Sequence, residues 1–167
     1  MDASFHLNQT AKKVAREKKN PPKRSVLEEI GNSVTHGVGA LFALVSLFFM
    51  LASADGARET AAVIIYSVGM ICAFTISCLY HAFPYGSAVK RLFRRFDYSS
   101  IYLLIGATFA PSLLCVFEGG FGVGFFIIQW SLIVVGITLV GVFGPARLRF
   151  IHIPTYVTLG WSALMLL

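Results

Sequence analysis

Three side chains of this sequence could together carry out hydrolytic chemistry. His81 follows Ser77 by four residues, so one helix would present both on the same face. Asp97 opens the next apolar stretch. Neutral imidazole is the commonest metal ligand, and a carboxylate can bind a metal or orient a water that becomes a nucleophile. Spacing leaves the metal interpretation open, because catalytic zinc needs three protein ligands and no HxxxH or HExxH pair occurs here.

Each of these side chains also has a simpler explanation. His81 could reach water at a membrane interface with its ring tip. Asp97 could cap a helix beside the basic residues 90–95. Ser77 could bond back to its own helix. Ionisable groups inside membrane spans are nevertheless costly and are by default functional, so both interpretations stand.

Three further polar side chains precede the first apolar stretch. Glu28, Asn32 and His36 recur at four-residue steps and share one helix face. We expect Asn32 and His36 to hold neighbouring helices together by hydrogen bonds rather than to bind metal. Glu28 joins them as a packing residue, or it lies in the first turn and faces the positive end of the helix dipole.

The elements that must position these residues are membrane-spanning helices. Of the 167 residues, 56% are hydrophobic and 13% charged, and mean hydropathy is +0.73. A soluble domain carries about 25% charged residues. Five apolar stretches come close to the roughly 20 residues that a spanning helix needs. They cover residues 34–52, 61–80, 98–116, 123–143 and 150–167. We therefore predict an all-α, polytopic helical bundle over residues 28–167, preceded by a disordered basic tail over 1–27.

Charge distribution predicts the orientation. Of the 14 Lys and Arg residues, seven precede the first stretch, four lie between the second and third, and two between the fourth and fifth. Only Arg58 falls in the other connectors. This asymmetry predicts a multi-pass plasma-membrane protein with a cytoplasmic N-terminus. It explains the net charge of +6 without a nucleic-acid partner and makes anionic membrane lipids the expected partners of the tail.

This topology brings the polar residues to one level. Glu28, Asn32, His36, Ser77, His81 and Asp97 all fall at the cytoplasmic ends of their helices. Deeper in the second stretch, Gly69 and Ala73 continue the Ser77–His81 face at four-residue steps. Small residues at that spacing allow helices to approach closely in membranes. We expect a polar pocket at the inner leaflet and a possible homo-oligomer formed through the small faces of the first two spans.

Three motifs resemble those of the hemolysin III proteins. Residues 28–37, EEIGNSVTHG, resemble that family's opening ExxNxx[ST]HG. Residues 77–81, SCLYH, resemble its SxxxH at the end of the second helix, and 97–102, DYSSIY, its Asp-led third helix. The resemblance covers about residues 26–167. It extends to the progestin and adiponectin receptor superfamily, to which the hemolysin III proteins belong.

The resemblance implies a seven-helix membrane fold with zinc near the cytoplasmic leaflet. It makes His81 the first zinc ligand and Asp97 and Ser77 the catalytic partners that orient water. Two further ligands would be histidines of an HxxxH in helix seven. The sequence ends at Leu167 after five spans. We therefore expect a C-terminally truncated member that lacks these histidines, with zinc expected for the full fold.

The resemblance suggests one function and two alternatives. The first is a zinc-dependent hydrolase scaffold that acts on a lipid-like amide at the cytoplasmic leaflet. The second is a pore-forming, channel-like cytolytic protein, since bacterial members take their name from haemolytic activity. The third is a receptor-like module that senses a lipid without catalysis.

Overall fold

The computed structural model describes residues 20–117 and 120–166. These residues form helices joined by short connectors, and they contain no strand. The elements are α2 (Val26–Ser53), α3 (Gly56–Ala82), α4 (Ala88–Pro111), α5 (Gly120–Phe143) and α6 (Arg149–Trp161). A π-helical turn, Ser112–Val116, continues α4, and a 3-10 turn, Ser162–Leu166, follows α6. The all-α prediction is confirmed. Most of the predicted basic tail, residues 1–19, lies outside the described residues.

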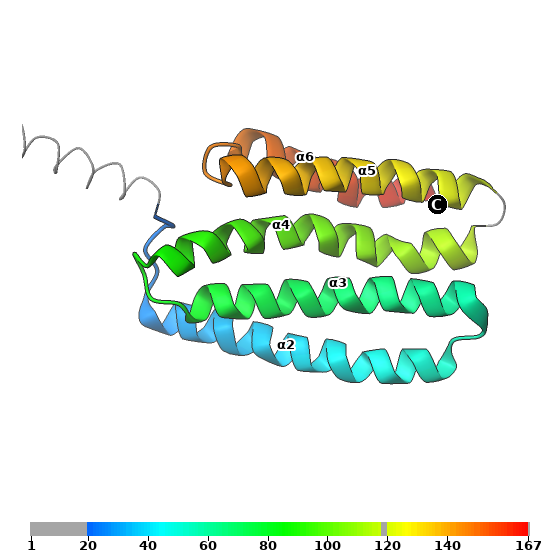
Figure 1. The fold of residues 1–167 in the computed structure, drawn as a ribbon, viewed down its shortest axis with the longest axis horizontal. Coiled ribbons are helices and arrows are strands. Elements are labelled where there is room, and N and C mark those ends of the chain that lie inside the picture. Colours follow the sequence, from blue (N-terminus) through cyan, green and yellow to red (C-terminus); the bar gives the residue numbers. More distant parts are fainter. Residues whose placement is uncertain (1–19, 118–119, 167) are drawn as a thin grey trace, which may run out of the picture.

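The helices form a row in chain order (Figure 1). α2 packs on α3, α3 on α4 and α4 on α5, while α6 lies against α4 and α5. α2 stands at the edge of the row, and Ala43 is its only fully buried residue. Its large apolar side chains, among them Phe42 and Phe49, are exposed. Such a surface suits lipid tails rather than water.

Among the described residues, four helices are long and apolar enough to cross a membrane: α2, α3, α4 with its π-helical turn, and α5. They contain the first four predicted apolar stretches. The fifth stretch, 150–167, is also helical, but α6 has 13 residues and carries Pro154 inside it. A helix of that length rises about 20 Å, short of the roughly 30 Å of a hydrocarbon core.

Two helices, α2 and α4, begin earlier than the apolar pattern predicted, because a serine caps each of them. Ser25 and Glu28 form a reciprocal capping box, so α2 begins at Val26, inside the predicted tail. The Ser87 hydroxyl accepts from the Lys90 amide at 3.0 Å and starts α4 at Ala88. Asp97 therefore lies in the interior of α4, and the alternative that it caps this helix is wrong.

Small residues allow α3 to approach both neighbours. A Cβ on Gly69 would overlap the Cβ of Ala107 in α4, and Gly39 of α2 lies against the Phe74 ring of α3. The small faces predicted for the first two spans thus pack against helices of the same chain. Homo-oligomerisation through these spans stays a prediction, because packing within one chain does not test contacts with a second copy.

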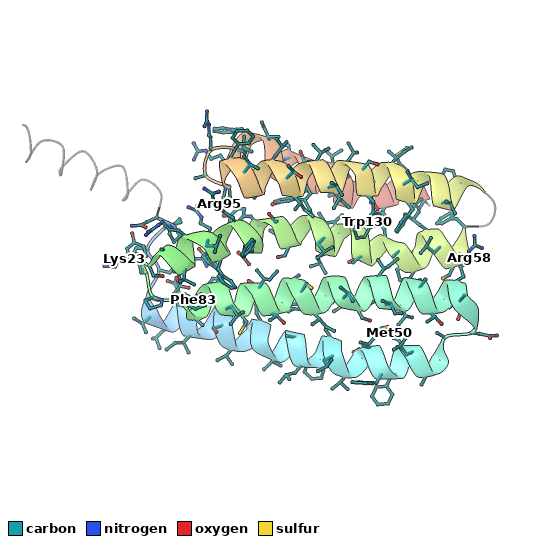
Figure 2. The ribbon with its side chains drawn as sticks, in the orientation of Figure 1. Lys23, Met50, Arg58, Phe83, Arg95 and Trp130 are labelled. Atoms are coloured by element: carbon teal, nitrogen blue, oxygen red, sulfur yellow. The ribbon has the colours of Figure 1, made fainter. Side chains whose placement is uncertain are left out.

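Basic residues lie mainly at one end of the row. Figure 2 shows Lys23 and Arg95 at the end where α2 and α4 begin, and Arg58 at the opposite end. α3 and α5 finish at the first end. Arg147, in the connector that follows α5, and Arg149, the first residue of α6, lie there too. The charge asymmetry of the sequence is therefore an asymmetry between the two ends of the folded molecule.

Candidate functional site

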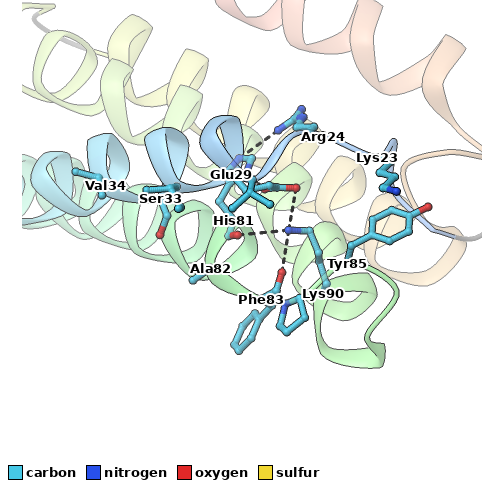
Figure 3. A pocket seen from close by; sticks show the side chains of 13 residues that line it. Lys23, Arg24, Glu29, Ser33, Val34, His81, Ala82, Phe83, Tyr85 and Lys90 are labelled. Carbon is cyan, nitrogen blue, oxygen red and sulfur yellow. Dashed lines mark hydrogen bonds and ion pairs between the residues drawn. The ribbon is translucent and has the colours of Figure 1, made fainter.

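Three helices meet around a cavity at the basic end of the row. The first turns of α2, the last turn of α3 and the start of α4 enclose about 480 Å³ (Figure 3). Its lining combines basic, acidic and apolar side chains. The lining residues are Lys23, Arg24, Val26, Glu29, Ile30, Ser33, Val34, His81, Ala82, Phe83, Pro84, Tyr85 and Lys90.

Glu29 is the centre of the polar part of this cavity. Its Oε2 accepts a hydrogen bond from His81 Nδ1 at 2.6 Å, and its Oε1 accepts from Lys90 Nζ at 3.0 Å. The one carboxylate thus joins α2 to both α3 and α4. Hydrogen bonds with ionised partners are short and strong, so this contact fixes the mutual position of the three helix ends.

Lys90 is a buried cation, with only 1% of its side chain exposed. Besides Glu29, its ammonium donates to the Phe83 carbonyl at 2.9 Å and the His81 carbonyl at 3.4 Å. It also lies 5.0 Å from the centre of the Tyr80 ring. A cation at the last carbonyls of α3 is stabilised by the negative end of that helix dipole. Each donor of this ammonium therefore has an acceptor, as burial of a charge requires.

His81 is held through one ring nitrogen. Because an ionised carboxylate can only accept, the contact with Glu29 places the proton on Nδ1. The other nitrogen, Nε2, then carries a lone pair and lies 3.5 Å from the Arg24 guanidinium. A carboxylate that orients a histidine and sets its tautomer is the usual arrangement behind a metal-ligating imidazole.

The structure brings the three predicted chemical residues together. Asp97 lies beside the Ser77 hydroxyl. Its carboxylate is also close enough to the His81 and His36 side chains to interact with them electrostatically. Ser77 and His81 are both buried on the predicted face of α3. The Ser100 hydroxyl donates to the Asp97 carbonyl at 2.7 Å, a local bond within α4. Carboxylate, hydroxyl and imidazole thus come from two adjacent helices and face one region.

The three predicted residues of α2 differ in position. The His36 ring centre lies 5.9 Å from that of His81, and its Nδ1 is buried without a partner among the described residues. Asn32 is half-buried. Glu28 is exposed and accepts from the Ser25 amide at 2.7 Å, so it belongs to the helix cap rather than to the cavity. Glu29, and not Glu28, is therefore the carboxylate that α2 contributes to the cavity.

Two residues of the site, Glu29 and Lys90, were missed from the sequence. A signal existed for Glu29, which precedes Asn32 by three residues and His36 by seven and so shares their face. It also occupies the Glu position of the ExxN motif. For Lys90 the sequence held no signal, because it is one of four basic residues in the stretch 90–95.

Comparison with known proteins identifies the family. The sequence model described as Haemolysin-III related matches residues 24–167. This chain belongs to the haemolysin III family. It is 35% identical over 141 residues to Hemolysin-3 of Bacillus cereus, a match that covers 81% of this chain and 63% of that protein. It is 31% identical over 140 residues to a Hemolysin-3 homolog of Bacillus subtilis (strain 168), covering 82% and 65%.

The chain spans slightly less than two thirds of the length of these haemolysin III relatives. No solved structure matches it. Family membership and the apolar helices make it an integral membrane protein.

The zinc expected from the haemolysin III resemblance can be tested against these positions. Within residues 20–117 and 120–166, no three His, Cys, Asp or Glu side chains are placed to hold a metal ion together. His81, with its Nδ1 held by Glu29, fits one ligand position, and the unpartnered Nδ1 of His36 lies nearby. The described residues thus fit one ligand and its surroundings, and a complete set would need donors from elsewhere.

Proposed function

We propose that this chain supplies part of the active site of a zinc-dependent hydrolase that acts on a lipid-like amide at the cytoplasmic leaflet. The observation that supports this most is the 2.6 Å bond from His81 Nδ1 to Glu29, which directs Nε2 away from the carboxylate. Asp97 lies near this ring, and the Ser77 hydroxyl lies beside Asp97. A bound zinc ion supplies Lewis acidity, which polarises a carbonyl and makes water acidic enough to attack at neutral pH.

The chain's own residues would each perform one task. His81 offers Nε2 as a neutral ligand, and Glu29 keeps that tautomer. Asp97 accepts the proton of the attacking water, and the Ser77 hydroxyl orients the carboxylate. Water adds to the amide carbonyl, the carbon–nitrogen bond breaks, and Asp97 returns the proton to the departing amine.

The cavity suits an amphiphilic substrate. One side is formed by apolar residues of α2, including Ile30 and Val34, which are exposed on the lipid-facing edge of the row. The other side is formed by polar groups of Lys90 and Glu29. An acyl chain could lie along α2 while the amide reaches His81. The proposed inner-leaflet position follows from the basic residues gathered at this end.

Metal analysis of the purified, folded chain tests this proposal. We expect zinc bound by His81 together with donors outside the described residues; this zinc is lost on His81→Ala, while Asp97→Asn retains zinc and abolishes amide hydrolysis. Cys115→Ser is the control, because Cys115 is exposed and lies in the turn at the opposite end of α4. A folded protein that binds no zinc under saturating metal would contradict the proposal for this chain.

A second candidate is a pore-forming protein, as the name Hemolysin-3 of the Bacillus relatives suggests. The open edge of the row favours it, because α2 exposes large apolar side chains and packs mainly against α3. A second copy or several could pack there. Single-channel conductance of the purified chain in planar bilayers tests this candidate, and its absence at high protein concentration would contradict it.

A further inference from the structure

A second cavity lies at the basic end of the molecule, away from His81. It occupies about 510 Å³ between the early turns of α4 and the connector from α5 to α6. Four of its nine lining residues are arginines, and none is acidic. The lining consists of Arg91, Arg94, Arg95, Val142, Phe143, Gly144, Pro145, Ala146 and Arg147.

The arginines form a concentrated positive charge. Arg91, Arg94 and Arg95 share one face of α4, where like charges at these spacings repel each other. Arg147 adds a fourth charge from the connector. Both salt bridges of the described residues end on Glu29, so within that part of the chain none of the four pairs with a carboxylate. A bound anion would relieve this repulsion.

Hydrogen bonds to backbone carbonyls and to the Asn20 side chain hold three of these side chains in place. Arg95 Nη1 donates to the carbonyls of Gly141 and Val142 at 2.8 and 3.2 Å. Arg91 and Arg94 each donate from Nη1 to Asn20, at 3.1 and 3.4 Å. A guanidinium has five donors, so each of these bonds leaves others for a ligand.

One donor is already buried without an acceptor. Arg94 Nε is inaccessible and has no hydrogen-bond partner among the described residues. An unpaired buried donor is unfavourable, so an acceptor that reached this nitrogen after a small movement of the Arg94 side chain would remove a penalty rather than merely add a contact. Planar guanidinium groups match phosphate oxygens in pairs, which makes phosphate the anion best suited to four arginines.

Apolar surface continues from the cavity along α5. Val142 lines the cavity and is exposed, and Val135 and Ile128 repeat its position at seven-residue steps and are exposed as well. Residues seven apart share a helix face. This stripe lies on a helix of membrane-spanning length. A ligand with phosphate in the cavity could therefore lay acyl chains along α5.

We propose that this cavity binds the headgroup phosphate of an anionic phospholipid, with the acyl chains on the exposed face of α5. Phosphatidylcholine carries a phosphate too, but its ammonium would enter a field of four positive charges. Basic pockets between membrane helices are known to take anionic headgroups. The orientation of the protein needs basic residues on one side of the membrane, but it does not require them to converge on a cavity.

Lipid titration of the purified full chain in detergent, followed by native mass spectrometry, tests the site. We expect dioleoyl phosphatidylglycerol to bind about tenfold more tightly than dioleoyl phosphatidylcholine, and Arg147→Gln to remove about tenfold of that affinity. Arg149→Gln is the matched control. Arg149 carries the same charge two residues further on, at the start of α6, but it stacks 4.5 Å from the Phe150 ring and does not line the cavity.

Three results would overturn the proposal. Equal binding of the two lipids would exclude headgroup selection, and equal effects of Arg147→Gln and Arg149→Gln would indicate general surface charge. Inorganic phosphate that displaces phosphatidylglycerol at equal concentration would mean a free-phosphate site. If Arg147→Gln fails to fold, loss of the lipid preference of the unchanged protein between 50 and 500 mM salt would still support the site, and its persistence would contradict it.

Discussion

Glu28 and Glu29 are neighbours in the chain with opposite surroundings. Glu28 is exposed and closes the capping box with Ser25. Glu29 faces the row of helices and joins His81 to Lys90. Successive residues of a helix point about 100° apart, so the rotation of α2 decides which carboxylate enters the cavity. The two residues therefore provide a matched pair for experiment.

Glu29→Gln should destabilise the protein much more than Glu28→Gln. Loss of the Glu29 charge leaves the Lys90 ammonium buried without its counter-ion, a change that costs about 3–5 kcal/mol for fully buried pairs. Because the Glu29 side chain is 17% exposed, we expect the lower end, about 3 kcal/mol. Gln can replace Glu in a capping box, so Glu28→Gln should be nearly neutral. Reversible unfolding in mixed detergent micelles measures both, and equal losses would refute the assignment.

Replacement of both members of the ion pair should cost less than replacement of one. Lys90→Met alone leaves Glu29 without its ammonium, and Glu29→Leu alone leaves Lys90 charged and buried. The double variant removes both charges, and such exchanges of a buried pair are often neutral. A double-mutant cycle on the free energy of unfolding should therefore give a coupling of about 2 kcal/mol or more. Additive losses would show that the two groups do not interact.

At the scale of the helices, the approach of α3 to α4 depends on glycine. A Cβ on Gly69 would overlap Ala107, whereas a Cβ on Gly124 in α5 would meet nothing within 4 Å. Overpacking of a tight contact costs typically 1–3 kcal/mol. Glycine in an open helical position is itself less favourable than alanine by about 1 kcal/mol.

Gly69→Ala should therefore lower the free energy of unfolding by about 1–3 kcal/mol, and Gly124→Ala should leave it unchanged or raise it. Both variants add one methyl group to a membrane helix, Gly69→Ala in the middle of α3 and Gly124→Ala near the start of α5, and they differ mainly in what surrounds that methyl group. The same micelle unfolding assay compares them. If Gly69→Ala were as stable as Gly124→Ala, α3 and α4 would not be in the close contact described.

The helix boundaries show which local signals the sequence offered. The Ser25–Glu28 capping box can be recognised in the sequence, but the apolar pattern placed the start of the first helix later. Ser87 gave a similar signal for α4. Both caps lie among basic residues, where hydropathy is low and the apolar stretch has not begun. For this reason hydropathy located the spans but not the polar first turns, which carry Glu29 and Lys90.

At the scale of the whole molecule, the charge asymmetry predicts which end faces the cytoplasm. We expect a cysteine at position 23 to be protected in intact cells and one at position 59 to react with a membrane-impermeant maleimide. Lys23→Cys and Glu59→Cys would be introduced into a chain whose three native cysteines are replaced by alanine. Both positions are exposed and lie near opposite ends of the row.

Permeabilised cells provide the control, because both cysteines should then react. Labelling of position 23 but not 59 in intact cells would reverse the proposed orientation. It would also move the Glu29–His81–Lys90 cavity to the outer leaflet. The proposal of a cytoplasmic-leaflet substrate would then fail, while the contacts of the site would stand.

The sequence by itself determined the helical class, the four long spans, and the common level of Ser77, His81 and Asp97. These follow from hydropathy, from the 3.6-residue period and from charge, which are properties of short segments. The tertiary structure decided the open row, the choice of Glu29 over Glu28, the burial of Lys90, and the meeting of Arg147 with the arginines of α4. Each of these depends on how helices rotate about their axes and which of them become neighbours. Such choices are fixed by packing between segments far apart in the chain, so no local pattern contains them.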